Sequence, residues 1–220
     1  MNSGGENLWP VLFKAAGETL QMVVSTLGIG GLAGLVLGVL LYTTRSGNLL
    51  ANRPVQTVLS VLVNIVRPIP FIIFITAVQP LTIKVTGASF GTASVIFPMA
   101  IMATFATSRI VEQNLVALDS GVIEAARAMG AGPMRIITTV IVPEALGPLI
   151  LGYTFLFVAI TDMSAMAGAV AGGGLGDFAL VYGYQRFDSG VTWTAVAVII
   201  VIVQLAQLLG NRLARRVLRR

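Results

Sequence analysis

Side chains that could support catalysis are scarce in this chain of 220 residues, which contains neither cysteine nor histidine. That composition excludes thiol chemistry, disulfides and the usual zinc sites, and it removes the commonest general base. The chain also lacks a Gly-x-x-x-x-Gly-Lys-Ser/Thr loop, so it cannot hold the phosphates of ATP itself. We predict no catalytic residue, no metal ligand and no cofactor. Any work done by ATP must come from a separate subunit.

Asp162 interrupts an apolar run, where a carboxylate is costly unless it reaches water, pairs or becomes protonated. Ser164 and Met166 follow it and offer a hydroxyl and a thioether suited to the lining of a transport path. Three interpretations stay open for Asp162. In the first, Asp162 lies near the outer end of its span and is wetted at a dimer interface. In the second, it attracts a substrate ammonium group. In the third, it pairs with Arg67 or another cation.

Arg67 interrupts a second apolar run and is followed by Pro68 and Pro70, which disrupt regular helical hydrogen bonding. Arg67 either snorkels to the membrane interface, or together with Pro70 it fixes a broken helix beside the path. A run of glycines, Gly172, Gly173, Gly174 and Gly176, predicts an outer loop where the backbone makes a close approach. That loop is either a hinge or a contact with an external protein.

The elements that must position these residues are membrane helices. The chain is 56% hydrophobic and 10% charged, with a mean hydropathy of +0.90, whereas soluble domains carry roughly a quarter charged residues. We predict an all-α integral membrane protein, with one transmembrane domain over residues 1–220. Each of five apolar runs exceeds the roughly 20 residues that cross a bilayer, and the five predicted spans are about 19–44, 56–80, 86–108, 145–168 and 190–211. The first apolar run is too long for the core of a cleaved signal peptide.

The distribution of basic residues predicts the orientation of the spans. Three basic residues fall on one side of the predicted membrane: Lys14, Lys84 and Arg186. The other side receives Arg45, Arg53, Arg109, Arg127, Arg135, Arg212, Arg215, Arg216, Arg219 and Arg220. We therefore expect a multi-pass protein of the cell membrane, with its N-terminus outside and its C-terminus in the cytoplasm. The basic tail directly follows a span, which favours anchoring to anionic lipid headgroups over nucleic-acid binding.

Small residues indicate how the first span packs. Gly30, Gly34 and Gly38 recur every four residues, so they share one face of a helix. Such a face allows a second helix to approach closely in lipid. We predict a tight helix crossing here.

A polar island at about residues 111–143 separates the third and fourth predicted spans. Asp119 or Ser120 can cap a helix whose first turn holds Glu124. Ala125 and Ala126 favour helix, while Gly130 suits the C-terminal cap of that helix.

Pro133 suits the first turn of a second helix, and Pro143 begins the return to the membrane. We predict two short helices with a tight corner at the cytoplasmic surface. The corner is interpreted as the docking site of an energy-supplying subunit, the alternative being an ordinary amphipathic connector.

The island also resembles a known family signature. Glu124-Ala125-Ala126, then Gly130, and after nine residues Val140-Ile141-Val142-Pro143, is similar to the motif of permease subunits of binding-protein-dependent ABC importers. The two valines stand where Ile and Leu are usual. The resemblance implies that this segment is the coupling helix, which inserts into a cytoplasmic ATPase. It implies that Glu124, Ala125, Ala126, Gly130, Pro133 and Pro143 serve the coupling.

Further motifs resemble the methionine-uptake permeases over nearly the whole chain. They are residues 42–47, 67–72, 128–134, 164–168, 172–176 and 182–184. The resemblance implies a homodimer, two cytoplasmic ABC ATPase subunits, an external substrate-binding protein, and import of D- and L-methionine by alternating access. Asp162 departs from that family, which usually has a small uncharged residue nearby.

Two alternatives remain open. The first is an ABC permease for another amino acid or a quaternary amine. The second is an ion-coupled secondary transporter, which would use intramembrane carboxylates and inverted repeats; Asp162 supports it thinly and the sequence has no evident internal repeat.

Overall fold

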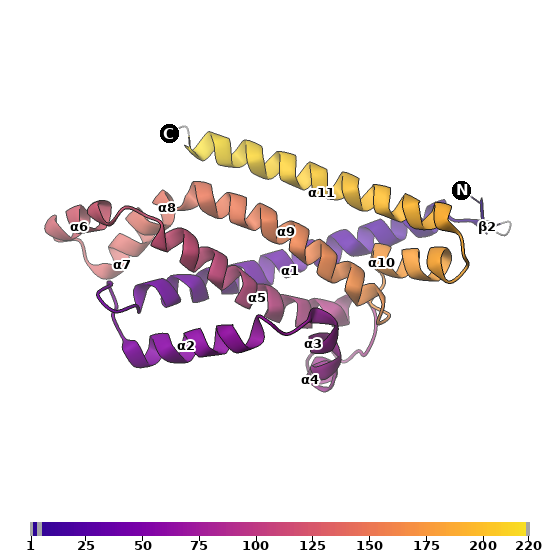
Figure 1. The fold of residues 1–220 in the computed structure, drawn as a ribbon, viewed down its shortest axis with the longest axis horizontal. Coiled ribbons are helices and arrows are strands. Elements are labelled where there is room, and N and C mark those ends of the chain that lie inside the picture. Colours follow the sequence, from indigo (N-terminus) through magenta and orange to yellow (C-terminus); the bar gives the residue numbers. More distant parts are fainter. Residues whose placement is uncertain (1, 4–5, 219–220) are drawn as a thin grey trace.

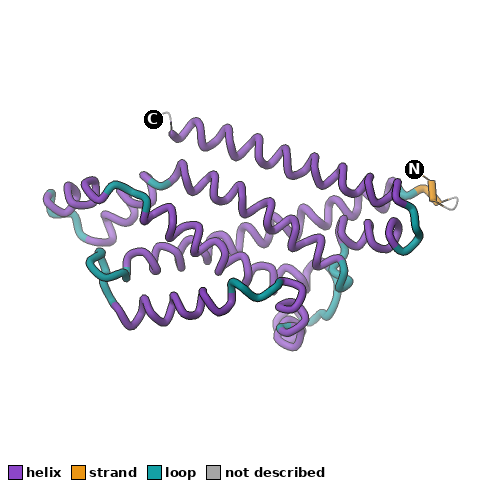
Figure 2. The backbone as a smooth tube through the Cα atoms, in the orientation of Figure 1, coloured by secondary structure: helices purple, strands orange, loops and turns teal. Residues whose placement is uncertain are grey.

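The computed structural model describes residues 2–3 and 6–218, and most of these residues are helical (Figures 1 and 2). A two-stranded antiparallel ribbon, β1 (Asn2–Ser3) and β2 (Glu6–Asn7), precedes the first helix. Four described helices are long and apolar enough to cross a membrane: α1 (Trp9–Thr43), α5 (Thr92–Val116), α9 (Leu146–Gly168) and α11 (Ser189–Leu218). The predicted all-α membrane architecture is confirmed.

The second predicted span, 56–80, is two helices and not one. α2 (Arg53–Val66) and α3 (Phe71–Ala77) meet at a bend of 103° across residues 67–70. The prolines explain the break, because Pro68 and Pro70 cannot donate the hydrogen bonds that would continue α2. α4 (Gln79–Thr86) follows α3 directly. If the bent pair is one broken span, the chain has five crossings.

Short helices join the long ones at both ends of the bundle. α6 (Ser120–Ala128), α7 (Pro133–Ile136), the π-helical turn η1 (Ile137–Ile141) and α8 (Val142–Glu144) connect α5 to α9. α10 (Gly174–Phe178) and η2 (Ala179–Tyr184) connect α9 to α11. In Figure 1, α6, α7, α8 and the C-terminus lie at one end of the molecule, and α10 and the N-terminus lie at the other.

The close crossing predicted from Gly30, Gly34 and Gly38 is confirmed. The partner of α1 is α5, and a Cβ atom on Gly34 would lie 2.7 Å from the carbonyl oxygen of Thr104. The same atom on Gly38 would lie 2.6 Å from the oxygen of Ser108. The two backbones therefore touch along the glycine face of α1.

One buried apolar cluster fixes the end of the bundle that carries α6. Tyr42 of α1, with Val111 and Leu115 of α5, packs there against Ile123 and Ala126 of α6. These contacts hold α6, the first helix of the polar island, against the ends of α1 and α5.

Candidate functional site

The α6–α7 corner has the predicted local geometry. The Asp119 carboxylate caps α6 by accepting a hydrogen bond from the Gly121 N–H at 2.8 Å. Gly130 has φ +79°, a left-handed conformation that ends the helix and favours glycine. Pro133 lies in the first turn of α7. Glu124 lies in the second turn of α6 and not in the first as predicted, because the helix already begins at Ser120.

The two sides of α6 differ in exposure. Ile123 and Ala126 face the buried cluster, whereas Glu124, Ala125 and Arg127 are exposed. Ala126 can therefore act only by packing α6 onto the bundle, while Glu124 and Ala125 are available to a partner.

Two methionines that the sequence analysis missed lie at the tip of the corner. Met129 is 81% exposed and Met134 is 69% exposed, on either side of Gly130. Exposed flexible apolar side chains are typical of surfaces that fit a partner's groove. Their position beside Gly130, the predicted cap of the first short helix, could have indicated that they lie at the tip of the corner.

The return from the corner runs through the wide π-helical turn η1 into α8. Pro143 and Glu144 of α8 are exposed. They line a hollow of about 570 Å³ together with Arg216 near the end of α11. Pro143 thus lies at the junction of the corner, α9 and the basic C-terminal helix.

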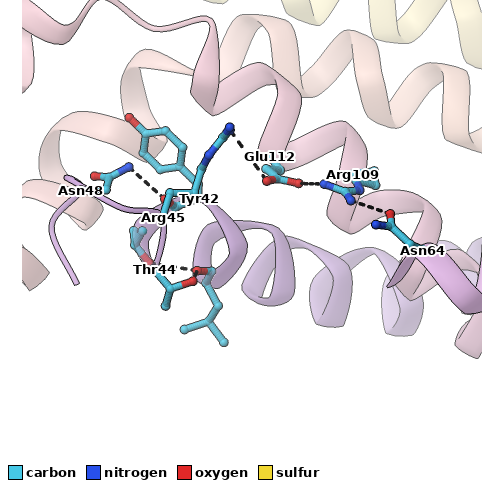
Figure 3. A network of polar contacts seen from close by, with 9 residues as sticks. Tyr42, Thr44, Arg45, Asn48, Asn64, Arg109 and Glu112 are labelled. Atoms are coloured by element: carbon cyan, nitrogen blue, oxygen red, sulfur yellow. Dashed lines mark hydrogen bonds and ion pairs between the residues drawn. The ribbon is translucent and has the colours of Figure 1, made fainter. Parts of the chain in front are cut away.

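A charged network lies beside the corner (Figure 3). Glu112 of α5 is buried, with 5% of its surface exposed. Its carboxylate pairs with the guanidinium groups of Arg109, one turn away, and of Arg45 at 3.8 Å. The second Arg109 nitrogen, Nη2, donates a hydrogen bond to Oδ1 of Asn64 on α2 at 2.6 Å. Glu112 and Asn64 were not predicted as functional residues from the sequence.

A hollow of about 300 Å³ separates the corner from the loop between α1 and α2. Arg45, Glu124 and Arg127 line it together with Tyr42 and Asn48. The Asn48 side chain donates to the Tyr42 carbonyl at 2.9 Å, which fixes the loop (Figure 3). Arg45 therefore contributes to both the hollow and the buried Glu112 pair.

The five path candidates do not share one surface. Asp162 and Met166 are exposed and lie one turn apart on α9, on the same stripe as Leu151 and Phe155. Ser164 is buried, and its hydroxyl donates to the Thr161 carbonyl at 2.6 Å. The structure thus brings Asp162 and Met166 together and separates Ser164 from them.

The two remaining path candidates are exposed at the α2–α3 break. Arg67 ends α2 and Pro70 precedes α3. Among residues 2–3 and 6–218, no ion pair within 4 Å joins Asp162 to Arg67 or to another cation. Within the same residues, no three His, Cys, Asp or Glu side chains gather as metal ligands would.

The four glycines of the predicted outer loop pack against other parts of the same chain. Gly173 and Gly174 have φ +81° and +78°. The Gly174 N–H donates to the Glu18 carboxylate at 2.9 Å, and the Leu175 N–H donates to the Thr19 hydroxyl at 2.8 Å. α1 thereby supplies the N-terminal cap of α10.

The other glycines of this loop meet α9. A Cβ atom on Gly176 would lie 2.7 Å from Ala165 Cα, and one on Gly172 would lie 2.6 Å from the Ala167 oxygen. Burial, followed by the charge of Glu18, raises the pKa of the Asp177 carboxyl in the same segment.

Residues 12–220 match the family described as the inner membrane component of binding-protein-dependent transport systems. The chain belongs to this family. It is therefore a multi-pass permease of the inner membrane, and the family expected from the resemblance is confirmed.

Two relatives and one solved structure similar to this permease are named for methionine. It is 40% identical over 207 residues to the probable D-methionine transport system permease protein MetI of Vibrio cholerae, covering 94% of this chain and 92% of the relative. It is 37% identical over 200 residues to the methionine import system permease protein MetP of Bacillus subtilis, covering 91% of this chain and 90% of that one. An inward-facing structure of the MetNI methionine ABC transporter superposes with a TM-score of 0.94 at 38% identity, covering 96% of the permease and 97% of the solved chain.

Proposed function

We propose that this chain is the permease subunit of an ATP-driven importer of D- and L-methionine. Two copies of it would form one transmembrane domain each, residues 1–220, and would be powered by two cytoplasmic ABC ATPase subunits. An external substrate-binding protein would deliver the substrate. The observation that carries this proposal is the likeness to methionine permeases over more than nine-tenths of the chain.

The α6–α7 corner is proposed as the coupling helix. Ile123 and Ala126 fasten α6 to α1 and α5, so a push on the corner reaches the membrane helices. The exposed Glu124, Ala125 and Met129 would contact the ATPase, with Gly130 and Pro133 shaping the corner and Pro143 linking it to α9. Closure of the ATPase would move this corner and exchange inward-open for outward-open states.

The test is purification with bound partners and transport in vesicles. We expect an ABC ATPase to co-purify at one copy per permease, and ATP with the binding protein to drive uptake of labelled L-methionine. Unlabelled D-methionine should compete, whereas another amino acid or a quaternary amine should not. Uptake that follows an ion gradient without ATP would establish a secondary transporter instead.

The orientation is a separate prediction. The loop between α1 and α2, the α6–α8 segment and the end of α11 share one end of the molecule (Figure 1). That end carries most of the basic residues, which favours the cytoplasm. Arg219 and Arg220 also counted toward it but lie outside the described residues. A reporter fused after the C-terminus should be active in the cytoplasm, and one beside Lys84 of α4 should report from outside. The reverse pattern would overturn the assignment.

The exposed stripe of α9 is proposed as part of the transport path. A lone carboxylate facing lipid is costly, so Asp162 is better placed at a wet dimer interface or path, where Met166 offers an apolar contact one turn away. Asp162→Asn keeps size and removes charge, and it should reduce methionine uptake several-fold with normal ATPase binding. Asp162→Glu, the charge-conserving control, should retain uptake. Equal uptake by both variants would leave the charge without a role.

A further inference from the structure

Helix α2 is held weakly to the rest of the chain. Val63 is its one buried residue, while Val58, Val61 and Ile65 are exposed. Its end turns through 103° into α3, so α2 and α3 form a bent arm on the side of the bundle (Figure 1). α2 itself therefore depends on polar contacts for its position within the chain, whereas α3 is packed against α5 through Phe71 and Ile75.

Among the side-chain hydrogen bonds of the described residues, the one that joins α2 to α5 runs from Arg109 to Asn64, at 2.6 Å. The Arg109 guanidinium is planar, and its Nη1 donates a hydrogen bond to the Glu112 carboxylate. The pairing with Glu112 therefore orients the Nη2 that donates to α2 (Figure 3). Glu112 is buried, and a buried carboxylate is stable only when it is paired. Arg45 supplies its second partner.

The same stretch of α5 leads directly to the corner. Val111 and Leu115 belong to the buried cluster that holds Ile123 of α6, and they lie on either side of Glu112 in the sequence. A helix transmits displacement along its axis because its backbone is hydrogen-bonded at every turn. Movement of α6 therefore reaches Arg109 within two turns.

We infer that Asn64, Arg109 and Glu112 are positioning residues that transmit movement of the α6–α7 corner to the α2–α3 arm. This set of three residues is called the arm latch. Glu112 orients Arg109, Arg109 holds Asn64, and Asn64 moves the arm whose break carries Arg67 and Pro70. The inference rests on the proposed function, because it assigns the corner as the place where force enters.

The first test compares transport with ATP hydrolysis in the reconstituted complex. Asn64→Leu removes the acceptor at similar size. It should leave ATP hydrolysis and ATPase content near wild type but lower methionine transported per ATP by on the order of tenfold, the effect of one hydrogen bond to a charged group. Asn64→Asp restores an acceptor for Arg109 and should restore coupling. Thr57→Val, an exposed change on the same helix, should have no effect.

A second measurement does not depend on transport. The chain has no native cysteine, so Thr57→Cys on α2 and Gln113→Cys on α5 can carry spin labels on the permease within the reconstituted complex. Asn64→Leu should broaden the distance distribution between these labels, and Asn64→Asp should narrow it again. Unchanged distances, or equal losses of hydrolysis, transport and thermal stability, would overturn the latch. Broadened distances in a chain that transports no methionine would refute the proposed function alone.

Discussion

Gly130→Val should abolish methionine uptake while the permease still inserts in the membrane. Gly130 has φ +79°, a conformation in which a β-branched side chain costs about 1–3 kcal/mol. α6 is short, and its two buried residues, Ile123 and Ala126, are what pack it against the bundle. The corner would change conformation before the helix bundle does, and the exposed Met129 and Met134 would no longer hold their present positions at its tip. ATP-dependent uptake in vesicles and ATPase content after purification measure the loss.

Gly132→Val is the matched control for this variant. Gly132 lies two residues further on, with φ −70° and ψ 160° and open space around its Cβ position. Valine adopts that backbone readily, so this variant should retain uptake and ATPase. If both variants behave like wild type, the shape of the corner does not govern coupling.

Gly34→Leu should prevent accumulation of folded permease. Its Cβ atom would lie 2.7 Å from the Thr104 oxygen and 2.9 Å from Thr107 Cγ2, and the obstructing oxygen belongs to backbone. Overpacking costs typically about 1–3 kcal/mol where side chains can move aside, and here a whole helix must move. The yield of monodisperse protein after detergent extraction, and its thermal unfolding temperature, should both fall sharply.

Gly28→Leu provides the comparison on the same helix. Nothing lies within 4 Å of the Cβ position of Gly28, which is exposed. That variant adds the same side chain outside the crossing and should give a normal yield. Normal yield and stability of Gly34→Leu as well would mean that α1 and α5 pack less tightly in the membrane than in this structure.

Hydropathy located the long apolar helices better than it located their ends. α1 begins ten residues before predicted residue 19, and its extension contains Lys14 and Glu18, which pair at 3.7 Å. α5 continues past residue 108 through Arg109 and Glu112. Charge marks where lipid immersion becomes costly, but backbone hydrogen bonding continues a helix beyond that point. The helices α1, α5 and α11 therefore extend beyond the predicted spans, α1 at its start and α5 and α11 at their ends.

The corner was predictable because its signals are local. Asp119, Gly130 and Pro133 each fix the backbone within a few residues of themselves. The arm latch was not predictable, because Asn64 and Arg109 are 45 residues apart and meet only through helix packing. Ser164 shows a related limit: a position two residues from Asp162 lies about 200° around a helix, so proximity in sequence placed it on the wrong surface.

The N-terminal cap that α1 supplies to α10 has a consequence for biosynthesis. Glu18 and Thr19 bond to backbone groups 156 residues later in the chain. Before those residues leave the ribosome, Glu18 and Thr19 cannot form these two bonds. Once they arrive, a five-residue helix with two left-handed glycines at its start gains the bonds it cannot supply itself. The end of the permease that carries α10 is thus completed late. A chain that lacks residues 1–19 should lose both bonds and leave that end incompletely folded.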